Sequence, residues 1–151
     1  MSEIAFRVDG PPRTWQRART NKGRHFDSPK QKRAKIEIFH AGRAALIRSG
    51  VKTFVGAVGL EVVAVYPRPK QRPPWTDAET WKAGGRIYKP TRGDLDNVAK
   101  LIADSIQPKK GARLLPGHVL KDDAQVARFI ATKQIAAVGE EAHTMVRVWS
   151  L

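Results

Sequence analysis

The stretch that decides the fold is residues 60–66, LEVVAVY, a dense apolar run bounded by Gly59 and Pro67. An apolar run of this length, with a glycine before it and a proline after it, is typical of a strand that is buried on both faces. We therefore expect a central strand here, with the remaining elements of the chain packed around it.

Upstream of this strand the sequence predicts one strand and one helix. Residues 4–8 alternate between apolar and polar side chains, as a half-buried strand does. Ser28 followed by a proline is typical of a helix start, and Gln31 stands where it can complete a capping box. We expect this helix to end at Gly50. The polar, basic residues 13–24 are expected to form an exposed loop or arm.

Downstream, the sequence predicts a second helix and two more strands. The helix covers Leu95–Ile106, whose apolar residues fall on one face, and the strands cover Gln125–Ile135 and His143–Trp149. Residues 67–92 are rich in proline, glycine and basic residues, and are expected to form a long loop. The expected order is β-α-β-α-β-β. This order predicts an α/β (α+β) fold with a single mixed sheet backed by helices, in one domain over residues 1–151.

The charge of the chain indicates a polyanionic partner. Its 28 Lys and Arg against 14 Asp and Glu give a net charge of +14 in 151 residues, which favours nucleic acid, although RNA-binding and anionic-membrane proteins share this property. The absence of cysteine excludes a disulfide framework, a thiolate zinc site and a cysteine nucleophile. Residues 1–10 lack the apolar segment of a secretory signal, and no apolar run is long enough to span a bilayer. We therefore expect a cytoplasmic protein without a membrane partner.

Acidic residues are concentrated in one part of this basic chain, because five of its eight aspartates lie between positions 94 and 123. Asp94 and Asp96 stand at the start of the second helix. Asp122 and Asp123 precede the next strand, so we expect both pairs at the same edge of the sheet. Carboxylates beside a basic surface suit Mg²⁺, which takes oxygen ligands together with substrate phosphate oxygens. The same residues also suit helix capping and turns, and composition and spacing leave both interpretations open.

Lys100 lies four residues after Asp96, on the same face of the predicted helix. Two interpretations are open for it. One is a surface ion pair with Asp96, and the other is a contact with a phosphate or with the charge that develops at the scissile phosphorus. Asp104, one helical turn further on, is expected to be structural. The four histidines lack metal-ligand spacing, which disfavours a zinc site or a histidine-based nuclease.

Basic residues gather in two stretches, one before and within the first helix and one leading into Asp94. Contacts of such residues go mainly to phosphates, and they predict DNA binding that weakens steeply with salt. The residues expected to make these contacts are Arg13, Arg17, Arg19, Lys32, Lys70, Arg72, Lys89 and Arg92. Trp15, Trp75 and Trp81 suit either stacking on unpaired bases or a place in the core or in a dimer interface.

Two acidic segments together resemble the signature of the RusA-type Holliday-junction resolvases. Residues 93–100 are GDLDNVAK and residues 122–126 are DDAQV. The first matches an Asp-x-Asp-Asn pattern with a lysine four residues after the second aspartate, and the second matches an Asp-Asp-x-Gln-Val segment. We call them the first and the second acidic segment.

The resemblance implies a role for each matching residue. Asp94, Asp96 and Asp123 correspond to metal-binding catalytic aspartates, Asp122 to an adjacent acidic position that also serves the metal, and Lys100 to an essential lysine. The resemblance also implies a homodimer, of bacterial or phage origin, that binds a four-way DNA junction. Such a dimer nicks two strands symmetrically with Mg²⁺, or with Mn²⁺ as a substitute, and its two-fold symmetry suits the junction.

The chain departs from the shortest members of this family in two loops. Residues 107–121 add Lys109, Lys110 and Arg113 near the predicted site, and residues 67–92 carry two tryptophans. These differences leave the preferred substrate open. The alternatives are a nuclease for flaps or other branched DNA, a ribonuclease on the same site, and a basic DNA-binding protein without catalysis.

Overall fold

A five-stranded mixed sheet is the centre of the molecule, with the strands in the order β1-β7-β4-β6-β5. The computed structural model describes residues 2–17 and 19–151. The central strand β4 pairs in parallel with β6 and antiparallel with β7, and β1 and β5 pair antiparallel at the two edges. The strands of the sheet are β1 (Glu3–Asp9), β4 (Val58–Tyr66), β5 (Ile87–Tyr88), β6 (Val126–Ile135) and β7 (His143–Ser150). The α+β fold with a single mixed sheet is thereby confirmed.

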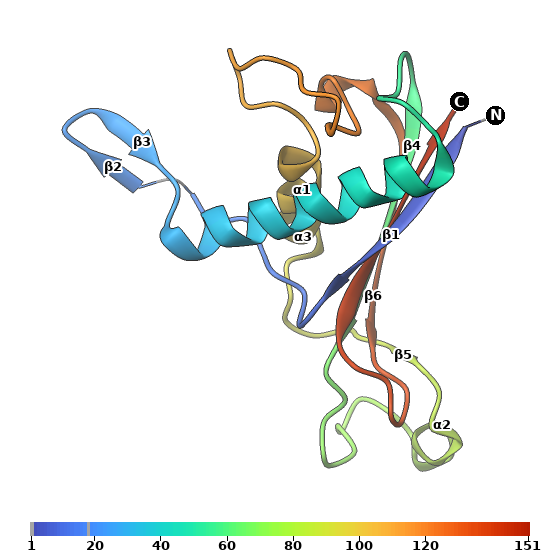
Figure 1. Ribbon diagram of the computed structural model, residues 1–151. Helices are drawn as coiled ribbons and strands as arrows, with labels where there is room; N and C mark the ends of the chain where they lie inside the picture. Colours follow the sequence, from blue (N-terminus) through green and yellow to red (C-terminus); the bar gives the residue numbers. More distant parts are fainter. Residues whose placement is uncertain (1, 18) are drawn as a thin grey trace.

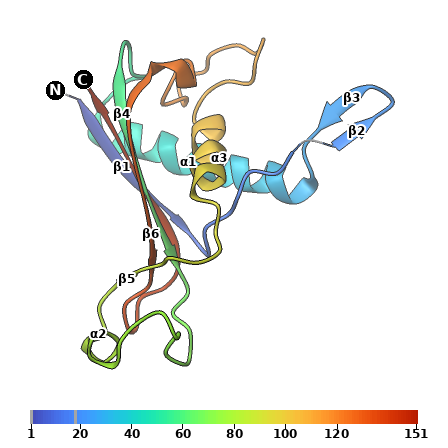
Figure 2. The same cartoon turned by 180° about the vertical axis from the view of Figure 1, so that it is seen from behind.

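Helices cover one face of this sheet, as Figures 1 and 2 show. The helical elements are α1 (Pro29–Ser49), α2 (Ala78–Ala83), α3 (Leu95–Ser105) and the 3₁₀ turn η1 (Asp123–Gln125). The long helix α1 crosses β1, and α3 packs beside α1 and against β4 and β6. Among the described residues, no helix combines the length and the apolar composition that crossing a membrane requires.

The expected start of α1 is confirmed, but the role of Gln31 was predicted wrongly. The hydroxyl of Ser28 accepts a hydrogen bond from the backbone N–H of Gln31, at 3.2 Å. The side chain of Gln31 does not return to Ser28 as a capping box requires. It is buried, and its amide bonds to the backbone N–H and carbonyl of Gln16. Gln31 therefore fixes the N-terminal arm to α1.

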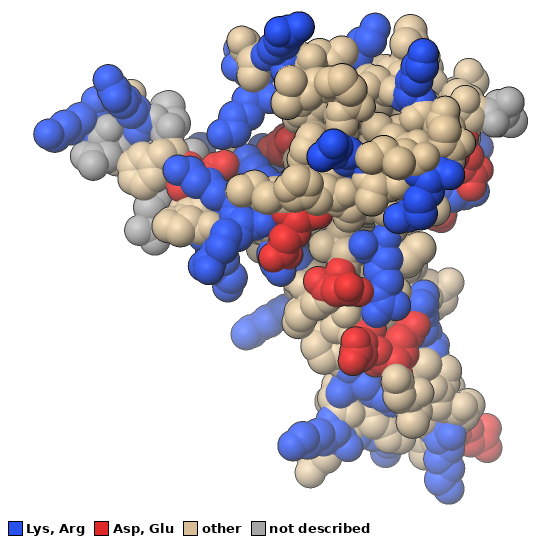
Figure 3. All heavy atoms as spheres, in the orientation of Figure 1, with Lys and Arg blue, Asp and Glu red and all other residues tan. Residues whose placement is uncertain are grey.

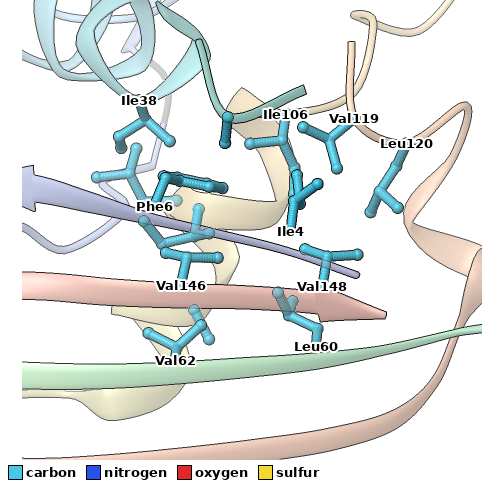
Figure 4. Packing of buried hydrophobic residues seen from close by; sticks show 14 of the residues in the cluster. Ile4, Phe6, Ile38, Leu60, Val62, Ile106, Val119, Leu120, Val146 and Val148 are labelled. Atoms are coloured by element: carbon cyan, nitrogen blue, oxygen red, sulfur yellow. The ribbon is translucent and has the colours of Figure 1, made fainter. Parts of the chain in front are cut away.

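The core lies between the sheet and the two longer helices (Figure 4). Alternate residues of β1, β4 and β7 point toward the helices, and their strands contribute Phe6, Leu60, Val62 and Val148, among others. Val62 and Val148 are completely buried. Because β4 is covered by neighbouring strands on both sides, its apolar run fits the central position that residues 60–66 predict.

Two segments expected to be loops contain regular structure. Residues 13–24 lead into a hairpin of β2 (Arg19–Asn21) and β3 (Arg24–Phe26), which projects from the body of the protein (Figure 1). Residues 67–92, which we call the lobe, contain α2 and β5. The lobe is held by Arg68, whose guanidinium lies 4.0 Å from the ring centroid of Trp81 and donates to three backbone carbonyls. Trp81 therefore has a structural partner within the chain.

Candidate metal and nucleic-acid site

The first acidic segment forms the start of α3. Asp94 caps the helix, because its Oδ1 accepts a hydrogen bond from the backbone N–H of Asn97. Its Oδ2 accepts a second hydrogen bond from the Asn97 side chain, at 2.8 Å. Asn97 thus orients the Asp94 carboxylate. Asp96, in the first turn, is exposed, and its carboxylate accepts no hydrogen bond from the described part of the chain.

The loop before Asp94 is packed against the end of β6. Lys133 donates from Nζ to the carbonyl oxygens of Thr91 and Gly93, at 2.5 and 3.0 Å. Gly93 has a φ of +121°, and a Cβ at this position would lie 2.7 Å from the hydroxyl oxygen of Tyr66. Only glycine fits there. Burial, together with the nearby negative charge of Asp94, raises the pKa of Tyr66.

The second acidic segment forms the turn η1 and is fixed by two glutamines. Asp122 caps the turn in a capping box with Gln125. The Gln125 amide also donates to the carbonyl oxygens of Phe54 and Gly56, which ties the turn to the loop before β4. The backbone N–H of Asp123 donates to the side-chain oxygen of Gln107, at 2.6 Å. The Asp123 carboxylate is exposed and accepts no hydrogen bond from the described residues.

The two acidic segments lie at opposite ends of α3. Lys133 near the end of β6 contacts the loop before the helix, whereas Gln107, which follows the helix, contacts the turn that precedes β6. Figures 1 and 2 show the chain entering α3 at one end and the residue 107–121 loop leaving it at the other. With a rise of about 1.5 Å per residue, Asp96 and Asp104 are separated by about 12 Å along the axis. The expected return of both segments to one edge is therefore not seen within a single chain.

The separation of the two acidic segments limits how many carboxylates one chain can offer to a single metal ion. Among the described residues, no group of three or more His, Cys, Asp or Glu side chains is close enough to hold one ion. Each end of α3 instead presents two aspartates, with carboxylate oxygens of the kind that Mg²⁺ prefers. An ion bound at either end would complete its ligand set with water, substrate phosphate oxygens or carboxylates of another chain.

Lys100 and Asp104 occupy the face of α3 between the two acidic segments. The Lys100 ammonium lies 3.5 Å from the ring centroid of Trp15, and it forms no ion pair with Asp96 in the part of the chain that the structure describes. The backbone N–H of Trp15 donates to the carbonyl of Asn97, at 2.9 Å. Trp15 therefore packs on α3 beside Lys100, in contact with the core. Burial raises the pKa of Asp104, although the positive charges of Lys35 and Lys100 oppose this shift.

Ion pairing is uneven among the acidic side chains: among the described residues, Asp77, Glu79, Asp104, Glu141 and the four aspartates of the acidic segments form no ion pair. Six acidic residues form ion pairs with lysine or arginine: Glu3, Asp9, Asp27, Glu37, Glu61 and Glu140. None of the four aspartates in the two acidic segments forms an ion pair with any described residue. In a chain of net charge +14, carboxylates without a basic partner are available to bind a cation.

Some of the predicted phosphate-binding side chains have partners within the chain, and others have none among the described residues. Arg13 pairs with Glu37, Arg72 donates to the carbonyl of Thr76, and Lys89 donates to Thr91 and to the carbonyl of Arg92. The exposed side chains that form no hydrogen bond or ion pair with described residues are Arg17, Lys32, Lys70 and Arg92. The side chain of Arg19 lies outside the part of the chain that the structure describes. Figure 3 shows Lys and Arg over the projecting hairpin and over the lobe.

Residues that the sequence did not single out complete both ends of α3. Gln107, Tyr66 and Lys133 come from three separate elements, so no local pattern could connect them with the aspartates. Gln125 belongs to the second acidic segment. A glutamine three residues after an aspartate is a capping-box pattern, so the sequence could have predicted its hydrogen bond to Asp122.

Comparison with known proteins gives one family match over most of the chain. The family model described as endodeoxyribonuclease RusA matches residues 9–148, which include both acidic segments and Lys100. Among curated proteins, no individual sequence matches the chain significantly.

Proposed function

We propose that this chain, which belongs to the RusA endodeoxyribonuclease family, resolves four-way DNA junctions as a Mg²⁺-dependent homodimer that makes paired, symmetrical nicks. Members of this family are DNA hydrolases that act on Holliday junctions and generally depend on a divalent metal ion. The finer points, namely the ion, the dimer and the paired nicking, are the proposal. Such an enzyme would act in the cytoplasm on bacterial or phage DNA.

One observation carries the proposal: the four aspartates of the acidic segments have no basic partner among the described residues, although basic residues outnumber acidic ones two to one. A structural carboxylate in such a chain can gain from pairing with lysine or arginine, as six other acidic residues do. The unpaired acidic residues elsewhere are single ones, such as Asp77, which caps α2, whereas each acidic segment gathers two unpaired aspartates at one end of α3. An unpaired carboxylate near bound DNA would repel the phosphates. A divalent cation removes this repulsion.

The donor chemistry fits Mg²⁺, and Mn²⁺ as a substitute, since every candidate ligand is a carboxylate oxygen. The residues that would hold the ion are Asp94, Asp96 and Asp123, with Asp122 beside them. When bound, the ion stabilises negative charge on the phosphate oxygens of the scissile bond. Asn97 orients Asp94 by its side-chain hydrogen bond, and the two glutamines hold the turn that carries Asp123.

A homodimer supplies what one chain lacks. Because the two acidic segments of one chain lie at opposite ends of α3, we propose that Asp94 and Asp96 of one subunit face Asp123 of the partner subunit. A two-fold axis then creates two equivalent sites, and these would act on equivalent strands of a junction. Lys100, on the helix face between the segments, would contact a phosphate of the bound strand.

The first experiment measures cleavage of an end-labelled four-way junction with Mg²⁺, with EDTA, and with the Asp94→Asn variant. We expect paired symmetrical nicks that DNA ligase reseals and that disappear in both controls, while the variant still binds the junction. Flap and fork substrates of the same sequence are tested in parallel. Preferential cleavage of a flap would assign the chain to branched-DNA repair. Binding without cleavage of any substrate would leave a non-catalytic DNA-binding protein.

A second experiment tests the proposed sharing of sites between subunits. Asp94→Asn and Asp123→Asn are each inactive as homodimers, and the two proteins are then mixed under conditions that exchange subunits. A shared site places both substitutions in one site of the heterodimer and leaves the other site intact. Nicking of one strand per junction should therefore return. If each site were built from a single chain, every site would carry one substitution and no activity would return.

A further inference from the structure

The function described above assigns no ligand to a cleft beside the C-terminal end of α3. It lies between α1, the base of the β2–β3 hairpin and the loop that follows α3, and it consists of two adjoining hollows of about 390 and 490 Å³. Both hollows are lined by Lys32, Lys35, Asp104 and Gln107, among other residues. The hydrogen bond from the Asp123 backbone to Gln107 connects this cleft with the second acidic segment.

The cleft is basic. Four lysines line it against two aspartates: Lys32, Lys35, Lys109, Lys110, Asp27 and Asp104. Lys35 is engaged, because its ammonium lies 2.8 Å from the Asp27 carboxylate and both side chains are largely buried. Lys32, Lys109 and Lys110 are exposed and form no ion pair with described residues. Three unpaired ammonium groups at one hollow fit the phosphates of a nucleic-acid strand.

The smaller hollow is also lined by apolar side chains. Phe39 of α1 lies there, with its ring centroid 5.2 Å from that of His118 in an edge-to-face arrangement. Ile36 and Leu115, on either side, are 54% and 49% exposed. Apolar side chains left open beside lysines suit a nucleobase, whose flat face packs on them while its phosphate meets the lysines.

We propose that this cleft binds one unpaired DNA strand next to the nuclease site, with its phosphates on Lys32, Lys109 and Lys110 and one base against Phe39. The hollow has the volume of a site for a single small ligand, which admits a nucleotide and not a duplex. The proposal rests on the proposed function, since it assigns the substrate strand that passes Asp123. It also gives a role to the residue 107–121 loop, which carries Lys109 and Lys110.

The test measures DNA binding in EDTA, so that cleavage does not enter. Binding of a junction with an unpaired tail, and of a blunt duplex, is titrated against salt for the wild type and for the triple variant Lys32→Ala, Lys109→Ala, Lys110→Ala. We expect the triple variant to lower the slope of log affinity against log salt by about 2 for the tailed DNA, at about 0.7 for each phosphate contact to a single strand. The matched control is Arg48→Ala with Lys52→Ala, near the other end of α1, which should leave the slope unchanged.

Phe39→Leu provides the second arm, because it keeps an apolar side chain in a partly buried position. We expect it to weaken binding of the tailed DNA at least fivefold and to leave duplex binding unchanged. An unchanged salt slope in the triple variant, or equal losses for tailed and duplex DNA, would overturn the proposal. If the proposed function is wrong but the cleft proposal is right, the wild type binds the tailed DNA through the cleft and cleaves no branched DNA.

Discussion

The lobe and the two ends of α3 use acidic residues in opposite ways. Glu140, in the turn before β7, accepts three hydrogen bonds of 2.6 to 3.0 Å from Arg86 of the lobe, and its pKa falls to about 2. Asp96 and Asp123, at the ends of α3, accept no hydrogen bond from any described residue. Both regions belong to the same basic chain, so the difference lies in local placement and not in composition.

We propose that this difference separates acidic residues that stabilise the fold from acidic residues that bind a metal ion. Arg86 satisfies Glu140, so the pair joins the lobe to the turn between β6 and β7. At α3 the arrangement is reversed: Gln107 and Gln125 fix the turn that carries Asp123, and Asn97 donates to the Asp94 carboxylate, while the carboxylates of Asp96 and Asp123 accept no hydrogen bond from the described residues. A fixed backbone under an unpaired carboxylate is what a preorganised cation site requires.

The largest expected effect comes from Asp96→Asn and Asp123→Asn. Each substitution removes a negative charge that has no structural partner, so we expect junction cleavage to fall by about 100-fold or more with little change in stability. Single-turnover cleavage and urea unfolding, measured on the same preparations, check both parts.

Glu140→Gln is the matched comparison, because it also neutralises one acidic residue. It should leave cleavage at the wild-type rate and lower only stability. If Asp96→Asn cleaved normally, or if Glu140→Gln lost cleavage as strongly as the α3 variants, the contrast between the two regions would not reflect function.

The next effect concerns Gln107, which positions Asp123 through a backbone hydrogen bond. Gln107→Ala frees the turn at one of its two attachment points, so we expect about tenfold slower cleavage and a higher Mg²⁺ concentration for half-maximal rate. Saturation by Mg²⁺ should recover part of the loss, which a general loss of folding would not permit. Gln71→Ala, an exposed glutamine of the lobe, is the control and should behave as the wild type.

A smaller effect is expected at Trp15, which holds the Lys100 ammonium at 3.5 Å from its ring centroid. Trp15→Leu removes the cation–π contact, and we expect cleavage to fall about fivefold with unchanged junction affinity. Trp15→Phe keeps an aromatic face and should restore most of the rate. In a Lys100→Met background the two Trp15 variants should cleave equally. A difference between them in that background would show that Trp15 acts through packing and not through Lys100.

Sequence reasoning predicted the elements whose signals are local. Residues 60–66 are apolar except for Glu61 and lie in the central strand, and Ser28 with its following proline starts α1 as expected. The hairpin in the basic arm was missed, because its strands are three residues each and polar. Its turn, however, contains Lys22 and Gly23, both with positive φ, and a glycine between two short extended segments is a hairpin signal.

The sequence predicts which residues form the candidate site but not how they are arranged. The two acidic segments are recognisable by pattern, but their separation depends on the direction of α3 along β6, which Lys133 and Gln107 show at its two ends. That direction is set by tertiary packing over the sheet. The sequence likewise does not show which basic side chains are paired within the chain. Arg13, for example, pairs with Glu37, which lies 24 residues away.

The smallest expected effect is on stability, and it concerns the ion pair of the lobe. Folding lowers the pKa of Glu140 from 4.5 to about 2, chiefly through the hydrogen bonds from Arg86. A carboxylate with a lowered folded pKa adds stability above its unfolded pKa, and this contribution disappears as the pH falls through the folded value. Solvent screens the partly exposed pair, so we expect Glu140→Gln to lower the free energy of unfolding by about 1 kcal/mol at pH 7. The loss should shrink between pH 4.5 and pH 2.

Glu37→Gln is the control for this prediction, because it removes an ion pair with Arg13 whose side chains are 54% and 34% exposed. Exposed pairs contribute about 0.5 kcal/mol or less, so this variant should lose less stability than Glu140→Gln at pH 7. Urea unfolding of both variants at pH 7 and pH 3 gives the comparison. Equal losses, or a Glu140→Gln loss that persists undiminished at pH 3, would mean that the Arg86 pair does not hold the lobe through its charge. The contrast with the unpaired aspartates of α3 would then rest on packing alone.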